Sequence, residues 1–234
     1  MSERDWIERG QPFLEAVDRW YQALPAVRMQ DLFLSPARVA VLCVDLTVGS
    51  VASGALAGPQ VRAIVPAIIS LLQSAYSLGV RYFLLLQDAH PPTAQEFAAL
   101  PSHSVTGTPE AETVPEVREL PFAHLFQVWP KNSLNAFLET PLGEWVDVHS
   151  GVNIYIVVGA GTDLGVYHLA MHLRLQANAR NLTRHVIVPA NCVATYHREA
   201  TTPTGAFPHE GELLHRLFLY HMALNGVRVV KEMV

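Results

Sequence analysis

The sequence has only two cysteines, Cys43 and Cys192, in 234 residues, and both lie within apolar segments. Two thiols cannot build the set of several disulfides that stabilises many small secreted domains. The low cysteine count therefore excludes a disulfide scaffold and favours a protein of the reducing cytoplasm. Thiols in apolar surroundings are expected to be buried and to pack as small apolar side chains.

Basic charge is scarce as well. The 16 Lys and Arg residues are outnumbered by 21 Asp and Glu residues, the formal net charge is −5, and no run of basic residues occurs. A surface that binds nucleic acid or an anionic membrane needs such a basic patch. We therefore expect neither nucleic acid nor a membrane as a partner.

Long apolar runs are also missing from the start of the chain. The first 30 residues carry charges throughout and lack the apolar stretch of a signal peptide or a membrane-spanning helix. Hydrophobic residues nevertheless make up 50% of the chain, which excludes a disordered or collagen-like protein and predicts a substantial buried core. The 11 histidines are many for a small acidic protein, so their positions matter.

Short apolar runs alternate with amphipathic segments, which is typical of a parallel sheet covered by helices on both faces. We expect strands at residues 39–44, 80–86, 124–129, 152–158, 185–188 and 226–230. We expect helices at about residues 11–23, 61–78, 140–148, 164–178 and 210–224. Because right-handed crossover helices join parallel strands, the alternation predicts an α/β fold, a doubly wound and mainly parallel sheet of about six strands in a Rossmann-like three-layer arrangement. Residues 1–36 are expected to form a helical extension and residues 37–234 one domain.

Polar residues follow several of these predicted strands. In open α/β sheets, ligands bind beyond the carboxyl ends of the strands. Asp45, Asp88, Lys131 and the turn at residues 159–165 all fall at such ends. We therefore expect them to converge on one site.

Asp88 and His90 stand one residue apart after the second predicted strand, and Glu96 and His103 follow in the irregular stretch at residues 88–120. Two imidazoles with one or two carboxylates suit Zn²⁺, Fe²⁺ or Mn²⁺. In the alternative interpretation, Asp88 caps a turn and the histidines are polar loop residues.

Asp45 ends an apolar strand, where an ionised carboxylate is costly unless it is paired. Lys131 follows another apolar segment and could pair with it, either as a structural salt bridge or as the means of setting a proton donor's pKa. The turn at residues 159–165 leads into a helix, and its backbone amides could hold a substrate oxyanion. Alternatively, this turn is tight and simply requires glycine.

Taken together, five segments resemble the isochorismatase-like hydrolase superfamily, which includes nicotinamidases, other cysteine amidohydrolases and isochorismatases. They are Val44-Asp45-Leu46, Asp88-Ala89-His90, and residues 101–108, 131–137 and 159–166. The resemblance spans about residues 39–230 and implies a doubly wound parallel sheet. It implies that Asp45 and Lys131 are catalytic and that Asp88, His90 and His103 bind a metal, with Glu96 as a fourth ligand found in some members. It also implies a cis peptide between Ala160 and Gly161, with neighbouring amides in the oxyanion hole.

Gly165 departs from the amidohydrolase pattern because it stands where the nucleophilic cysteine belongs. Residues 46–50 differ as well, because amidohydrolases usually carry Gln, Asp and Phe there. Isochorismatases, as the resemblance implies, also have glycine at the position of Gly165 and use the aspartate as a general acid on a vinyl ether. They lack the Asp-x-His and second-His pattern that this chain retains. One hypothesis that combines the two signatures is that a metal-activated water attacks the substrate while Asp45 transfers the proton.

We therefore expect a cytoplasmic hydrolase of a small metabolite, an amide or a vinyl ether, that uses Asp45 and Lys131 without a cysteine nucleophile. A divalent metal (Zn, Fe or Mn) is expected to assist, and no nucleotide cofactor is expected. The alternative is a catalytically inactive pseudoenzyme that keeps the fold and pocket for binding a ligand or partner. The two retained charges, Asp45 and Lys131, favour the hydrolase.

Other features bear on assembly. Because members of the superfamily commonly form dimers or tetramers, the resemblance implies a homo-oligomer. The aromatic stripe of Trp6, Phe13, Trp20 and Tyr21 suits a subunit contact or packing on its own domain. His168 and His172 share a helix face, which fits a polar face, an oligomer contact or a second metal site.

Overall fold

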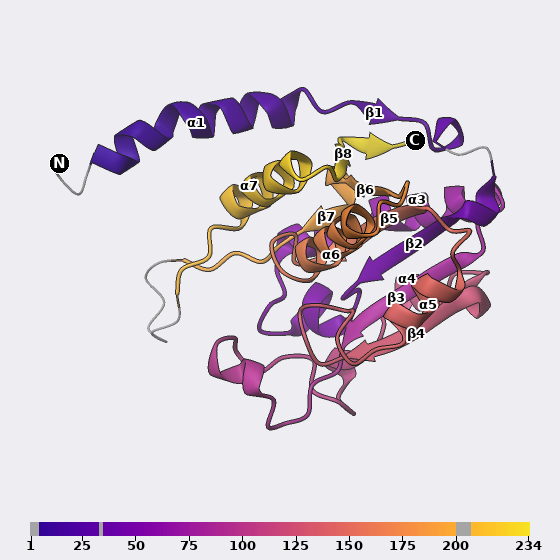
Figure 1. Ribbon diagram of the computed structural model, residues 1–234. Helices are drawn as coiled ribbons and strands as arrows, with labels where there is room; N and C mark the ends of the chain where they lie inside the picture. Colours follow the sequence, from indigo (N-terminus) through magenta and orange to yellow (C-terminus); the bar gives the residue numbers. More distant parts are fainter. Residues whose placement is uncertain (1–4, 33–34, 200–206) are drawn as a thin grey trace.

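The computed structural model describes residues 5–32, 35–199 and 207–234 (Figure 1). Its main sheet has the strand order β4-β3-β2-β5-β6-β8, with all neighbours parallel, and β7 extends it by pairing with β5. The strands are β2 (Val39–Val44), β3 (Tyr82–Asp88), β4 (Phe126–Lys131), β5 (Ile154–Ala160), β6 (His185–Pro189), β7 (Val193–Ala194) and β8 (Arg228–Val230). The predicted α/β fold with a doubly wound parallel sheet is therefore confirmed.

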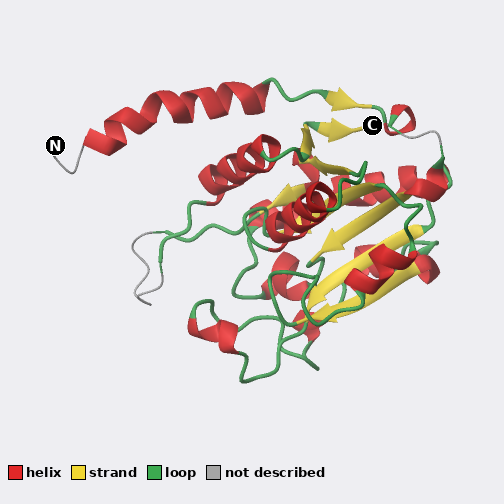
Figure 2. Cartoon of the chain, viewed as in Figure 1, coloured by secondary structure: helices red, strands yellow, loops and turns green. Residues whose placement is uncertain are grey.

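Helices cover both faces of this sheet (Figure 2). They are α1 (Asp5–Gln22), α2 (Pro59–Ala63), α3 (Val65–Ser77), α4 (Pro115–Arg118), α5 (Leu142–Val148), α6 (Gly165–Ala179) and α7 (Gly211–Leu224). Side chains of a strand alternate between faces, so Val41 and Cys43 face the layer of α2, α3 and α4. Leu42 and Val44 face the layer of α5, α6 and α7. Both faces of the central strands are thus buried, which explains why their sequences are almost wholly apolar.

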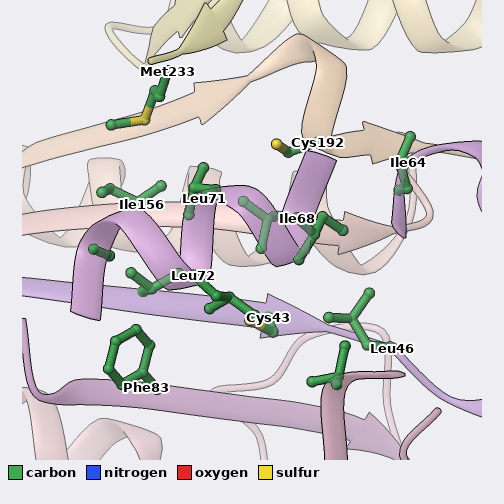
Figure 3. Close-up of a cluster of buried hydrophobic side chains, with 14 of the residues drawn as sticks. Cys43, Leu46, Ile64, Ile68, Leu71, Leu72, Phe83, Ile156, Cys192 and Met233 are labelled. Atoms are coloured by element: carbon green, nitrogen blue, oxygen red, sulfur yellow. The ribbon is translucent and has the colours of Figure 1, made fainter. Parts of the chain in front are cut away.

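The two cysteines belong to the apolar layer between the sheet and α3 (Figure 3). Both thiols are free and buried. Burial raises the pKa of Cys43 far above its usual range and that of Cys192 to about 12. The predicted role of both residues as small apolar side chains is confirmed, and neither supplies a thiolate near neutral pH.

The order of the strands creates a switch point in the centre of the sheet. From β2 the chain moves outward to β3 and β4, then returns to β5 on the other side of β2 and continues to β6 and β8. Val44 at the end of β2 pairs with Gly159 near the end of β5. Because the connections leave this edge in opposite directions, a crevice opens beyond the carboxyl ends of β2 and β5.

Several predicted boundaries were wrong. The single helix expected at residues 61–78 is two helices, because Pro66 has no N–H to continue the ladder of α2 and instead lies in the first turn of α3. The N-terminal helix begins at Asp5 rather than near residue 11. The sequence pattern also missed β7, and β1 (Ala26–Val27) with β9 (Glu232–Met233), which pair in a separate parallel sheet. Strands of two residues are too short to give a periodic signal.

Helix α1 lies alongside α7 (Figure 1). The rings of Phe13 and Trp20 meet the ring of Tyr220 edge-on, with centroids 5.6 and 5.2 Å apart. The Tyr21 hydroxyl lies 3.2 Å from Nε2 of His215. Part of the aromatic stripe therefore packs on its own chain, whereas Trp6 is 69% exposed. No helix among the described residues is long and apolar enough to cross a bilayer.

Candidate active site

Asp45 stands at the centre of the crevice, directly after β2. Its backbone adopts the left-handed region, with φ at 49°, which strains a residue that carries a Cβ. The side chain is buried and doubly bonded: Oδ1 accepts the Asp88 amide at 2.7 Å, and Oδ2 accepts the Lys131 ammonium at 2.9 Å. These contacts hold the carboxylate in one orientation and compensate for its burial.

Lys131 ends β4 and pairs in register with Asp88 at the end of β3. Its buried Nζ also donates to Oδ1 of Asp88, so one ammonium lies between two carboxylates. Although burial lowers the pKa of Lys131, the charges of Asp45 and Asp88 outweigh that effect and raise it. Asp45, Asp88 and Lys131 therefore converge at one edge of the sheet, as the sequence predicted. A lysine held between two carboxylates stays charged.

The two carboxylates differ in their electrostatic surroundings. Burial, followed by the neighbouring charge of Asp88, raises the pKa of Asp45 to about 6 against the opposing effect of Lys131. Burial also acts to raise the pKa of Asp88, but the charge of Lys131 opposes burial and holds this pKa well below its usual range. Asp45 is therefore the member of the cluster that can exchange a proton near neutral pH.

Asp88, His90 and His103 form a compact group of three buried side chains whose ligand atoms lie within 4.8 Å of one another. Nε2 of His90 and Nε2 of His103 each lie 3.5 Å from an oxygen of Asp88. Two atoms bound at about 2.1 Å to one tetrahedral ion are about 3.4 Å apart, so this spacing suits a shared divalent cation.

The hydrogen bonds of the two histidines also suit a metal. Nδ1 of His90 lies 2.7 Å from Oδ1 of Asn132, and Nδ1 of His103 lies 2.8 Å from the Pro101 carbonyl oxygen. Since the carbonyl can only accept, Nδ1 of His103 carries the hydrogen, and the same tautomer suits the Asn132 oxygen beside His90. Both Nε2 atoms are buried without a hydrogen-bond partner, which leaves their lone pairs free for an ion.

Glu96 lies at the margin of this group. Its Oε1 is 4.0 Å from Nε2 of His103 and is likewise buried without a hydrogen-bond partner. The side chain belongs to a short 3₁₀ turn, Gln95–Ala98, rather than to the strand ends that hold the other three residues. Its loop could bring it to the ion as an additional oxygen ligand.

The turn after β5 differs from the expected oxyanion hole. All described peptide bonds are trans, so the cis bond expected between Ala160 and Gly161 is wrong for this structure. Gly161 has φ at 70°, and the amides of Gly161 and Thr162 both donate to the Ala194 carbonyl oxygen, at 3.0 and 3.1 Å. Pairing with Ala194 of β7 thus occupies two of the amides that a free turn would offer to a substrate.

Gly165 begins α6 directly against Asp45. A Cβ atom at this position would lie 2.7 Å from Cγ1 of Val44 and 3.2 Å from Oδ2 of Asp45. The first of these distances is too short for two carbon atoms, so any side chain here would have to displace Val44. The space that a nucleophilic side chain would need is therefore largely taken by Val44 and the Asp45 carboxylate.

A small cavity of about 30 Å³ opens at this edge of the sheet. It is lined by Asp45, Ser50, Leu56, Val61, Asp88, His103, Leu134, Ala160, Gly161, Leu164 and Tyr196. Sequence reasoning missed Ser50 and Tyr196, because they come from the loop after β2 and the segment after β7, which have no motif. Ser50 accepts a hydrogen bond from the Thr47 hydroxyl at 3.1 Å, which leaves its own O–H free to donate.

The second metal site considered for His168 and His172 finds no support among the described residues. His168 directs Nδ1 to the Leu164 carbonyl oxygen at 2.8 Å, and the ring of His172 stacks on Phe137 with a centroid distance of 3.8 Å. Over the described part of the chain, the one group of three candidate ligands is Asp88, His90 and His103. The two helix histidines therefore have packing contacts.

Comparison with known proteins gives one consistent family. The Isochorismatase domain matches residues 39–204, more than half of the chain. Nicotinamidase 1 of Arabidopsis thaliana is 27% identical over 163 residues, which cover 62% of this chain and 64% of that protein. The chain thus spans less than two thirds of the length of this curated relative.

Solved structures share the fold. The nicotinamidase of Bacillus subtilis superposes with a TM-score of 0.64 at 23% identity, covering 82% of this chain and 99% of that one. The N-carbamoylsarcosine amidase of Thermoplasma acidophilum superposes with a TM-score of 0.62 at 21% identity, covering 83% of this chain and 96% of that one. The pyrazinamidase of Pyrococcus horikoshii in complex with zinc superposes with a TM-score of 0.63 at 20% identity, covering 83% of this chain and 99% of that one. The chain therefore belongs to the isochorismatase family of hydrolases.

Proposed function

We propose that this protein hydrolyses a small amide or vinyl-ether metabolite, with Asp45 as the proton-transfer residue and no covalent cysteine intermediate. The observation that carries the proposal is the position of Oδ2 of Asp45, 3.2 Å from where a Cβ of residue 165 would stand. A carboxylate with a pKa of about 6 thus faces the pocket beside the position at which the family's thiol enzymes carry their nucleophile. Both thiols of the chain lie instead in the apolar core.

The same pair of residues serves either substrate class. With a vinyl ether, protonated Asp45 gives its proton to the enol-ether carbon, and water adds to the resulting oxocarbenium ion while returning one proton to Asp45. The hemiketal then collapses to a carbonyl compound and an alcohol. With an amide, ionised Asp45 takes a proton from the attacking water and returns it to the leaving nitrogen. Lys131 donates a hydrogen bond to Oδ2 of Asp45. This bond fixes the orientation of the carboxylate and stabilises its ionised form.

We further propose that Asp88, His90 and His103 hold a divalent cation, Zn²⁺, Fe²⁺ or Mn²⁺, with Glu96 as an additional ligand. The unpartnered Nε2 atoms of the two histidines support this assignment, as does the zinc complex of the related pyrazinamidase fold. When bound, such an ion supplies Lewis-acid chemistry beside Asp45. Nothing in the pocket calls for a nucleotide cofactor, and none is proposed.

The test is a substrate panel. Purified protein supplied with Zn²⁺, Fe²⁺ or Mn²⁺ is assayed for ammonia release from nicotinamide and N-carbamoylsarcosine, and for pyruvate release from isochorismate. We expect turnover of at least one compound, and its loss in Asp45→Asn. A protein inert to the whole panel that gains amidase activity as Gly165→Cys would instead be a pseudoenzyme that keeps the fold for binding.

Location and assembly are part of the proposal. We expect a cytoplasmic protein that forms a homo-oligomer, a dimer or tetramer, with residues 1–36 as an extension of the domain at 37–234. Exposed Trp6 and Ile7 on α1, 69% and 59% exposed, support a subunit contact, as does the neighbouring apolar groove of Phe13, Tyr167, Phe218 and Leu224. Light scattering of two variants tests this subunit contact. Trp6→Glu is expected to yield monomers, whereas Leu175→Glu, which changes an exposed leucine of α6, is expected to leave the oligomer intact.

A further inference from the structure

His209 makes a set of contacts that the proposed chemistry does not use. Its Nε2 lies 2.7 Å from Oδ2 of Asp163, in the turn between β5 and α6. Its Nδ1 lies 2.8 Å from the carbonyl oxygen of Tyr196, in the segment after β7. One imidazole therefore ties together two stretches of chain that are far apart in sequence and that both line the pocket.

These two contacts determine the protons on the ring. A carbonyl oxygen only accepts, so Nδ1 must carry a hydrogen. An ionised carboxylate also only accepts, so Nε2 must carry one too. Burial tends to raise the pKa of Asp163, but the hydrogen bond from His209, together with Thr195 and the charge of His209, outweighs burial and lowers that pKa, in keeping with an ionised carboxylate. Each ring nitrogen of His209 therefore faces an acceptor.

The ring of His209 also supports a wall of the pocket. It stacks on the ring of Tyr196, with centroids 3.8 Å apart and planes at 13°. Tyr196 lines the pocket together with Gly161 and Leu164, which flank Asp163. The backbones of Arg198 and His209 also pair in an antiparallel bridge. The Arg198 amide donates to the His209 carbonyl oxygen at 2.8 Å, and the His209 amide donates to the Arg198 carbonyl oxygen at 2.9 Å.

Other charged groups stand near this contact but do not replace it. The Arg198 guanidinium lies over the Tyr196 ring, 5.3 Å from its centroid. Glu210, next in sequence, pairs with His197 at 3.3 Å rather than with His209. Thr162 on the same turn contacts Nδ1 of His215 from α7, at 2.9 Å. Asp163 is thus the carboxylate that faces His209 directly.

We propose that His209 is a positioning residue: it ties Asp163 to Tyr196 and so holds the turn and the aromatic wall of the substrate pocket. This role rests on the proposed function for its catalytic consequence. A side chain at residue 209 without N–H donors leaves the Asp163 carboxylate and the Tyr196 carbonyl without their partner, so the tie opens. The pocket wall is therefore expected to loosen in such a variant.

The experiment compares hydrogen exchange of the wild type and its variants by mass spectrometry, in peptides covering residues 159–166. The amides of Gly161 and Thr162, which donate to Ala194, report on the tie. His209→Phe keeps a stacking ring without donors and is expected to exchange at least fivefold faster than the wild type.

Asp163→Asn separates this role from a general structural one. An asparagine amide N–H can donate to Nε2 of a neutral His209 that still donates from Nδ1 to Tyr196. The variant is therefore expected to stay as protected as the wild type. His185→Gln, which changes an exposed histidine at the start of β6, is the control and should behave as the wild type.

Two results would overturn the proposal: a His209→Phe variant as protected as the wild type, or an Asp163→Asn variant that exchanges as fast as His209→Phe. Exchange needs no turnover, so the tie is judged even if the substrate panel shows no activity and the proposed function fails. Where one panel compound is hydrolysed, His209→Phe should raise its KM at least fivefold and change kcat less than twofold. An equal fall in kcat and kcat/KM would contradict a role in holding the binding wall.

Discussion

Oδ2 of Asp45 lies 3.2 Å from the point where a Cβ at residue 165 would stand, so the glycine and the carboxylate share one small volume. The chain reaches this arrangement by strain and pairing. Asp45 has a left-handed backbone, and its two oxygens are held by the Asp88 amide and the Lys131 ammonium. An oriented carboxylate therefore stands directly beside the position at which the amidohydrolases of the superfamily resemblance would carry a cysteine.

Gly165→Cys is expected to destabilise the protein and to give no amidase activity. The new Cβ would lie 2.7 Å from Cγ1 of Val44, and overpacking of this kind costs about 1–3 kcal/mol. Urea denaturation measures the loss. The double variant with Val44→Ala should recover part of it relative to Val44→Ala alone, whereas a stable and active Gly165→Cys enzyme would show that the site still accommodates a nucleophile.

Lys131→Met is expected to be the most damaging single change at the site. It leaves the buried carboxylates of Asp45 and Asp88 without their shared cation, and breaking a buried ion pair costs about 3–5 kcal/mol. Asp45→Asn should lower the free energy of unfolding much less, because Lys131 still forms its ion pair with Asp88. If the two variants were equally stable, the ammonium would not compensate the carboxylates as described.

Metal binding is expected to depend on the two unpartnered Nε2 atoms. Protein purified without chelator should contain about one equivalent of Zn, Fe or Mn by elemental analysis, and His103→Ala should lose it. Added Zn²⁺ at 100 times its Kd should stabilise the wild type by about 2.7 kcal/mol. His124→Ala, at an exposed histidine, is the matched control. Less than about a tenth of an equivalent in the wild type would contradict the ligand assignment.

Stability is expected to fall in acid because of His215. Burial lowers the pKa of this histidine to about 4, so the folded protein binds fewer protons than the unfolded chain between pH 4 and about pH 6.5. The free energy of unfolding should therefore drop by about 3 kcal/mol as the pH falls through this window. His215→Gln should show a shallower slope in denaturation at a series of pH values. An unchanged slope would assign the acid sensitivity to other groups.

The sequence predicted six of the seven strands of the main sheet, because the central ones are solid apolar runs between turn residues, and it missed the two-residue β7. It also predicted the convergence of Asp45, Asp88 and Lys131, since the carboxyl ends of parallel strands must meet at one edge. Tyr196 and His209 were beyond prediction, because their importance comes from contacts between distant segments. The local arrangement at Ala160–Gly161 was missed because it also depends on a contact between distant segments. Gly161 pairs with Ala194 of β7, and a strand of only two residues gives no signal in the sequence.

The histidines illustrate the same limit. His90 and His103 lie in a spacing that suggests metal ligation, whereas His209 and His215 look like isolated residues in sequence. In the structure these two hold Asp163 and Thr162, neighbours in the turn beside the pocket. Part of the histidine excess thus serves the site indirectly, through backbone position rather than through contact with the ligand.

The central claim is hydrolysis by Asp45 without a thiol, and a cysteine-free protein tests it most directly. Cys43→Ala/Cys192→Ala removes both sulfur atoms from the chain. On whichever panel compound the wild type hydrolyses, we predict that this variant keeps kcat/KM within about threefold, while Asp45→Asn loses at least a thousandfold. Loss of activity in the folded cysteine-free protein, or retention of activity in Asp45→Asn, would contradict the account.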